Sequence, residues 1–67
     1  MKIGEKLKEI RKENNLSQTK LGEILGTTQD TISLWELNKS LPDVIMLYKI
    51  CSLFNVSADY MLGLKEI

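Results

Sequence analysis

Few side chains in this sequence could support covalent or metal chemistry. The 67 residues include no histidine and one cysteine, Cys51. Without histidine, no Ser/His or Cys/His nucleophile can form, and a lone cysteine makes neither an internal disulfide nor a Cys-rich zinc site. The carboxylates lie beside lysines on polar faces, and no glycine-rich phosphate loop is present. We therefore expect no enzyme, no catalytic or metal-binding residues and no cofactor.

The stretch from Ser17 to Glu36 instead carries side chains suited to noncovalent recognition. It predicts two short helices joined by a tight turn at Gly26-Thr27-Thr28. Such a turn makes the helices cross steeply and can present the second helix outward, for insertion into a groove of nucleic acid. Gly22 would allow the two helices to approach closely. The apolar residues that would hold the pair from behind are Leu21, Leu25, Ile32 and Trp35.

The elements around this stretch are also helical, because apolar residues recur at helical spacing and β alternation is absent. The pattern predicts a single all-α domain over residues 1–67, a compact five-helix bundle with N-caps at Ser17, Thr28 and Ser57. The expected helices span about residues 3–14, 18–25, 29–37, 43–54 and 58–62. The expected inward residues are Ile3, Leu7, Ile10, Leu21, Ile24, Leu25, Ile32, Trp35, Leu47, Ile50, Phe54 and Cys51, the last as a small buried thiol.

The charge balance is unusual for a nucleic-acid binder, which is expected to be basic. Nine Lys+Arg balance nine Asp+Glu, so the formal net charge is zero. The distribution is polarised, since residues 1–20 hold six basic and three acidic side chains and the rest holds three basic and six acidic ones. Because steering depends on the local field, we expect DNA binding that is weaker and more salt-sensitive than that of a basic homologue.

No segment has the apolar length of a signal-peptide core or of a membrane span. With one free thiol and no export signal, the sequence predicts a cytoplasmic protein that does not contact a membrane. The hydrophobic content of 43% is sufficient for a core and too high for a disordered chain.

Almost the whole chain resembles the phage-repressor and Cro family of helix-turn-helix proteins, the xenobiotic-response-element-like regulators. The segments that carry the resemblance are LSQTKLG at 16–22, LGTTQ at 25–29, Ile32-Ser33 and Trp35-Glu36. The family's fourth and fifth helices match Pro42, Leu47, Lys49-Ile50, Asn55-Val56-Ser57, Asp59-Tyr60 and Leu62-Gly63. The resemblance implies a lambda-repressor-like DNA-binding domain and a transcriptional regulator, most simply a repressor, that reads the major groove with helix 29–37.

The resemblance assigns roles to two glutamines. Gln18 matches the glutamine that contacts a phosphate and braces the recognition helix, and free N–H groups at that helix start suit a phosphate. Gln29 matches the family's adenine-reading glutamine, whose amide can pair with adenine N6 and N7. The alternative for Gln29 is an ordinary solvated residue at a helix start, and its place after a glycine turn favours base contact.

Four further candidates for base contact complete the outward face of the third helix: Asp30, Thr31, Ser33 and Leu34. Asp30 could accept from cytosine N4 or stabilise the helix N-terminus. One of Thr31 and Ser33 is expected to contact DNA. Leu34 departs from the polar or basic residue common in the family, and it could pack on a thymine methyl or be partly covered by Trp35 and Leu37.

The resemblance also implies contacts to the phosphate backbone. In the family the loop after the third helix touches the backbone, and the residues at that point are Lys39 and the N–H of Asn38. For each lysine the alternative is a solubilising surface charge. Leu37 stands where the family often has a polar residue, so we expect one positioning contact to be missing. The candidates for phosphate contact are Ser17, Gln18, Lys20, Thr28, Asn38 and Lys39, with Lys6 in addition. Lys20 and Lys6 are the weaker ones.

Arg11 and Glu36 resemble a pair that forms a mostly buried salt bridge between the first helix and the end of the third. The alternative is that Arg11 contacts a phosphate, and we favour the bridge. If the bridge forms, removal of either partner leaves a buried charge without its counterion.

Apolar residues outside the expected core predict a homodimer. Ile45 and Met46 stand where the family usually has polar residues, and a helix that is apolar on nearly all sides needs burial beyond its own domain. Twofold symmetry would set the two recognition helices about 34 Å apart on a palindromic operator. The candidates for the dimer interface are Ile45, Met46, Ala58, Met61, Leu64 and Ile67.

Two alternatives remain open from the sequence. The first is an antitoxin-like interaction module whose fourth helix binds a protein partner and whose DNA binding is autoregulatory. The second is the DNA-binding domain of a longer repressor, in which another part of the chain carries dimerisation.

Overall fold

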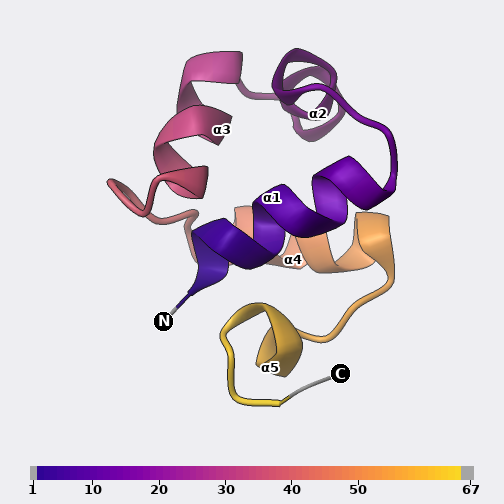
Figure 1. The fold of residues 1–67 in the computed structure, drawn as a ribbon, viewed down its shortest axis with the longest axis vertical. Helices are drawn as coiled ribbons and strands as arrows, with labels where there is room; N and C mark the ends of the chain where they lie inside the picture. Colours follow the sequence, from indigo (N-terminus) through magenta and orange to yellow (C-terminus); the bar gives the residue numbers. More distant parts are fainter. Residues whose placement is uncertain (1, 66–67) are drawn as a thin grey trace.

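The computed structural model describes residues 2–65 and folds them into five helices (Figure 1). The helices are α1 (Ile3–Glu13), α2 (Gln18–Leu25), α3 (Gln29–Glu36), α4 (Val44–Phe54) and α5 (Ala58–Met61). Residues 2–65 contain no strand. The pair α2 and α3 forms one end of the molecule and α5 the other, with α1 and α4 between them. The expected all-α, five-helix architecture is confirmed.

Four of the helices begin at a side-chain cap: Ser17, Thr28, Asp43 and Ser57. Each cap accepts a hydrogen bond from the backbone N–H three residues further on, which satisfies a donor that the helix start would leave free. The helix bounds differ from the expected ones by single residues. The residues concerned are caps just outside their helices: Asn14, Leu37, Asp43 and Leu62.

The turn between α2 and α3 depends on two glycines. Gly26 has a φ of 76°, in the left-handed region where a β-carbon is unfavourable. Gly22 lies against the turn itself, because a β-carbon there would be 3.0 Å from the carbonyl carbon of Thr28. The absence of side chains at these positions brings the two helices together at a steep angle.

Every helix contributes one side chain to the centre of the core. The largest fully buried side chains are Leu7, Leu21, Ile32, Ile50 and Met61. Burial of each contributes about 1.5–3 kcal/mol relative to exposure, so this set ties all five helices together. Ile3, Ile10, Leu25 and Trp35 complete the buried apolar cluster. α3 is therefore held from behind by its own Ile32 and Trp35, as expected.

The structure corrects several expectations about burial. Ile24 is 45% exposed, because Leu21 and Leu25 already fill the inner side of the short helix α2. Cys51 is half-buried against the core, as are Leu47 and Phe54, and this partial burial raises the pKa of the Cys51 thiol. Met61, expected at a dimer interface, is fully buried in the core, because α5 is a single turn that packs on α1 and α4.

No helix within residues 2–65 is long and apolar enough to cross a membrane.

Candidate nucleic-acid interface

The N-terminal ends of α2 and α3 lie side by side at one end of the molecule. Their first residues are hydrogen-bonded, since Gln29 Nε2 donates to Gln18 Oε1 at 2.6 Å. The caps Ser17 and Thr28 accept from one backbone N–H in each helix start, at 3.0 Å and 3.2 Å. The other N–H groups of these first turns have no helical acceptor, and together with the helix dipoles they favour an anion such as a phosphate.

The outward face of α3 carries the residues expected to contact DNA bases. Gln29 and Asp30 are exposed, and Thr31 and Ser33 are half-buried. Leu34 is 43% exposed, so part of its side chain is free for contact, and both alternatives for it stay open. Since Ile32 and Trp35 point into the core, α3 presents a continuous polar surface with one apolar side chain to solvent.

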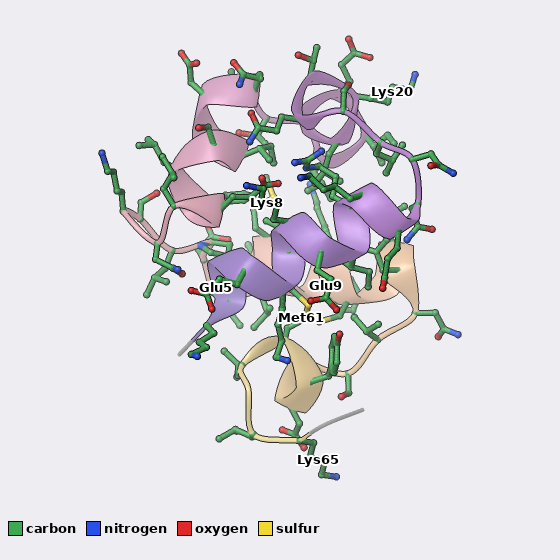
Figure 2. The ribbon with its side chains drawn as sticks, viewed as in Figure 1. Glu5, Lys8, Glu9, Lys20, Met61 and Lys65 are labelled. Atoms are coloured by element: carbon green, nitrogen blue, oxygen red, sulfur yellow. The ribbon has the colours of Figure 1, made fainter. Side chains whose placement is uncertain are left out.

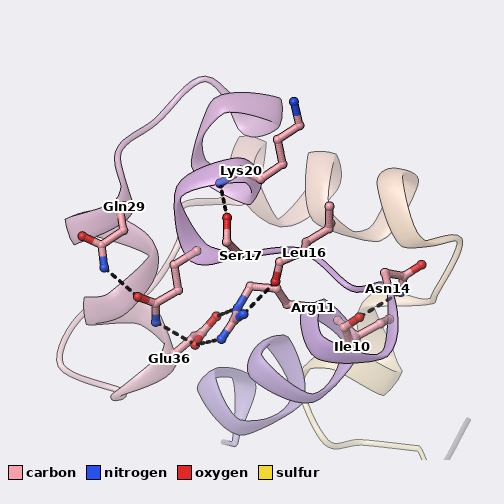
Figure 3. Close-up of polar contacts among 9 residues, drawn as sticks. Ile10, Arg11, Asn14, Leu16, Ser17, Lys20, Gln29 and Glu36 are labelled. Atoms are coloured by element: carbon pink, nitrogen blue, oxygen red, sulfur yellow. Dashed lines mark hydrogen bonds and ion pairs between the residues drawn. The ribbon is translucent and has the colours of Figure 1, made fainter.

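A chain of polar contacts connects this face to the interior of the protein (Figure 3). Arg11 Nε donates to Glu36 Oε2 at 2.6 Å, and Arg11 Nη2 donates to Glu36 Oε1 at 3.0 Å. Arg11 Nη1 donates to the Leu16 carbonyl at 2.8 Å. Gln18 Nε2 then donates to Glu36 Oε1 at 3.0 Å, and Gln18 Oε1 accepts from Gln29. The two charges thus pair inside the protein. The Arg11 side chain extends from α1 to Glu36 at the end of α3 and not into solvent.

The Glu36 carboxylate is held in its ionised form. Burial alone would raise its pKa, but hydrogen bonds from Arg11 and Gln18 and the positive charges of Arg11 and Lys8 outweigh burial and lower the pKa. The same pairing raises the pKa of Arg11. With side-chain exposures of 9% for Arg11 and 3% for Glu36, this is a bidentate pair largely shielded from solvent.

The basic candidates for phosphate contact lie on the surface. Lys20 projects from α2 into solvent (Figure 2), and its Nζ lies 3.8 Å from a Glu23 oxygen. Such an exposed pair is weak and leaves the lysine available to another anion. Lys39 is exposed just after α3. Lys6 reaches α5, since its Nζ lies 4.6 Å from the centre of the Tyr60 ring.

Asn38 has a role inside the protein that the sequence did not predict. Its backbone N–H donates to the Trp35 carbonyl at 3.0 Å, and its side-chain Oδ1 accepts from the Gly4 N–H at 3.0 Å. Asn38 thus joins the start of α1 to the end of α3. The N–H of Asn38 is thus already bonded within the protein, and its contact to a phosphate stays a prediction.

Sequence reasoning also missed the hydrogen bond between Gln18 and Glu36. The two residues are 18 positions apart and belong to different helices, so no local spacing relates them. The expected Arg11–Glu36 pair was an indirect signal. Arg11 also bonds to the Leu16 carbonyl just before α2, so the paired Glu36 carboxylate lies near the start of α2.

The residues expected at a dimer interface are placed differently from one another. Ile45 is 64% exposed and Leu64 72% exposed. Ala58 is exposed, and Met46 is half-buried against the core. Ile67 lies outside the described residues. The neighbours of Ile45 on α4, Val44 and Tyr48, are also exposed, and so is Leu41 in the segment before the helix. We call Leu41, Val44, Ile45 and Tyr48 the apolar α4 face.

A second helix anchored by its apolar side, with its polar side outward and its N-terminus beside that of the preceding helix, defines a helix-turn-helix module. A family model described as helix-turn-helix matches residues 7–61. The chain belongs to this family.

Known proteins similar to the chain are transcriptional regulators. The chain is 36% identical over 67 residues to the HTH-type transcriptional regulator ImmR of Bacillus subtilis, a match covering 100% of this chain and 53% of ImmR. It is 34% identical over 61 residues to YgzD, an uncharacterized HTH-type transcriptional regulator of the same organism, covering 91% of this chain and 92% of YgzD. The chain thus spans about half the length of ImmR.

The fold is similar to that of the P22 c2 repressor protein, whose structure was solved in complex with synthetic operator 9T. The TM-score is 0.84 at 28% sequence identity, and the match covers 91% of this chain and 92% of the repressor chain. The expected phage-repressor type of fold is therefore confirmed.

Proposed function

We propose that this chain is a sequence-specific, duplex-DNA-binding transcriptional regulator that inserts α3 into the major groove. The observation that carries the proposal is the exposed Gln29 at the first position of α3, hydrogen-bonded to Gln18. The residues behind it are rigidly packed, with Ile32 at 0% and Trp35 at 5% exposure. An N-terminal position on a surface helix lets a side chain reach base edges while the helix start contacts phosphates.

Repression is the regulatory outcome that we propose, and the likeness to the P22 c2 repressor supports it. We also propose that the protein acts in the cytoplasm, because its proposed role is at DNA. The antitoxin-like alternative is not favoured, because the relatives above carry the name of transcriptional regulators. The part of ImmR that this chain does not match leaves the second alternative, a domain of a longer repressor, compatible with the proposal.

The salt dependence of binding tests whether the α2–α3 end contacts phosphates. The affinity of the chain for duplex DNA is expected to fall steeply as salt rises, because each phosphate contact releases counterions. Lys39→Ala is expected to weaken binding to all sequences alike and to reduce the slope of log K against log salt by about 1. Fluorescence anisotropy with labelled duplexes measures both.

The matched control is Lys65→Ala. Lys65 lies beyond α5 at the far end of the molecule (Figure 2) and its Nζ is 3.6 Å from Asp59, so the salt slope should stay at the wild-type value. An equal reduction by both variants would mean that DNA does not approach the α2–α3 end.

We further propose that a second copy of the chain covers the apolar α4 face. Val44, Ile45 and Tyr48 are 79%, 64% and 72% exposed on adjacent turns of one helix. Ile24 and Leu53 extend this surface, because they line a shallow groove together with Tyr48. Apolar side chains gathered in this way are typical of a protein–protein contact, and a symmetric dimer would match a palindromic operator.

Charge placed in this face should abolish the dimer. We expect sedimentation equilibrium to give a dimer for the wild type and a monomer for Ile45→Lys, because a buried lysine would be unpaired in the contact. Leu37→Lys is the matched control: it changes an apolar residue after α3 that is 60% exposed and lies outside this face, and it should leave the dimer intact. A wild-type mass of one chain at the highest concentration would contradict the proposal.

A further inference from the structure

We infer that Glu36, a buried residue that does not reach the surface of α3, is a positioning residue for base selection by Gln29. It acts by fixing the orientation of two side-chain amides in series. The inference rests on the proposed function, since it assumes that Gln29 reads a base.

The first step is the orientation of Gln18. An ionised carboxylate has acceptors and no donor, so only the amide nitrogen of Gln18 can bond to Glu36. The structure has this arrangement, with Gln18 Nε2 donating to Glu36 Oε1 at 3.0 Å. Arg11 holds both carboxylate oxygens in place at 2.6 Å and 3.0 Å. The carbonyl oxygen of Gln18 therefore faces α3.

The second step is the orientation of Gln29. Because Gln18 presents an oxygen, Gln29 must turn its amide nitrogen toward it, and Gln29 Nε2 donates to Gln18 Oε1 at 2.6 Å. In Figure 3, dashed lines mark the two hydrogen bonds that connect Glu36 to Gln29 through Gln18. The Oε1 of Gln29 and the second hydrogen on its Nε2 remain free for DNA.

The groups left free match one base. An acceptor next to a donor on one amide pairs with adenine, which offers the N6 amino group and the N7 acceptor in the major groove. A reversed Gln29 amide would exchange the donor and acceptor positions and lose its bond to Gln18. The exposed Gln29 would otherwise rotate freely, so the chain from Glu36 sets its orientation before DNA arrives.

The test compares affinity ratios, because a ratio cancels any general loss of phosphate contact. For each variant, the affinity for a duplex with A·T at the position read by Gln29 is divided by that for duplexes with the other pairs. Glu36→Gln can present either an oxygen or an amide nitrogen to Gln18, and it should lower this ratio about fivefold or more. Gln18→Leu, which leaves the ion pair intact, should lower it similarly. Lys65→Ala, at the far end of the molecule, should leave the ratio unchanged.

A folded Glu36→Gln that keeps the wild-type ratio, while Gln29→Ala loses it, would overturn this inference and leave the proposed function standing. If the wild type has no preference at any base pair, the proposed function fails and the inference fails with it.

Glu36→Gln also weakens the ion pair, so its folding is checked by circular dichroism. If Glu36→Gln unfolds, NMR of the DNA-free wild-type protein tests the inference instead. Lowering the pH through the pKa of Glu36 should shift the side-chain amide signals of Gln18 and Gln29 with one shared midpoint, and Gln18→Leu should remove that midpoint from Gln29. Unlinked titrations of the two amides would overturn the inference.

Discussion

Arg11→Met is expected to lower the free energy of unfolding by about 3–5 kcal/mol. The substitution leaves the Glu36 carboxylate, 3% exposed, without its counterion, and it removes the bond to the Leu16 carbonyl as well. Small domains have total stabilities of about 5–15 kcal/mol, so this loss is a large fraction of the whole. Urea denaturation followed by circular dichroism measures it.

Two controls separate the stranded charge from loss of packing. Lys12→Met changes the neighbouring exposed residue and should alter stability by less than about 0.5 kcal/mol. The double variant Arg11→Met/Glu36→Leu removes both charges and should recover much of the loss, because a buried ion pair can often be replaced by apolar residues. If Arg11→Met were as stable as Lys12→Met, the pair would have no structural role.

The ion pair also sets how stability depends on pH. The pKa of Glu36 is lowered in the folded protein from an ordinary value of 4.5. Its contribution is therefore fully present above pH 4.5 and is lost as the pH falls through the lower, folded pKa. Arg11→Met removes the main cause of this lowering and leaves burial, which raises the pKa of Glu36. The part of the acid-induced fall in Tm that Glu36 causes should therefore be smaller than in the wild type or reversed in sign.

Gln29→Ala is expected to remove about 1–3 kcal/mol of discrimination at one base pair of each half-site. The amide of Gln29 is exposed and held by Gln18, and alanine can make neither of the two hydrogen bonds that read adenine. Competition between duplexes that differ only at that base pair measures the change.

Lys39→Ala is the control for this comparison, since a phosphate contact carries no sequence information. It should weaken binding to all the duplexes by the same factor. A Gln29→Ala variant that weakens binding without relaxing any position would place Gln29 outside the base-reading surface.

The helices could be predicted from the sequence because their signals are local. Ser17 and Thr28 accept bonds only three residues away, and Gly26 has the left-handed conformation that ends a helix. Apolar spacing likewise identified the inner faces of α1 and α3. These signals placed each helix to within one residue at either end.

Burial at the margins of the helices could not be predicted in the same way. Ile24 and Met61 both carry apolar side chains at helical spacing, yet one is 45% exposed and the other fully buried. Spacing defines a face, whereas burial depends on which neighbour covers it. Burial therefore depends on packing between helices that are distant in sequence. Met61 is buried where α5 packs on α1 and α4. Ile24 instead lines a shallow groove with Tyr48 and Leu53 of α4.

In the candidate site too, individual residues could be predicted and long-range contacts could not. Gln18, Gln29, Arg11 and Glu36 were identified through their resemblance to a family, but the bond between Gln18 and Glu36 was not. It requires the end of α3 to meet the start of α2, a long-range packing result. The same reason explains Asn38, whose side chain bonds to Gly4, 34 positions away.

Selection from a library of random duplexes with the wild-type chain tests the central claim, sequence-specific reading by α3, most directly. The account predicts enrichment of a palindrome whose half-sites each contain an A·T pair that Gln29→Ala, and no phosphate-contact variant, relaxes. No enriched sequence, with an affinity for every duplex that only fades as salt rises, would contradict it.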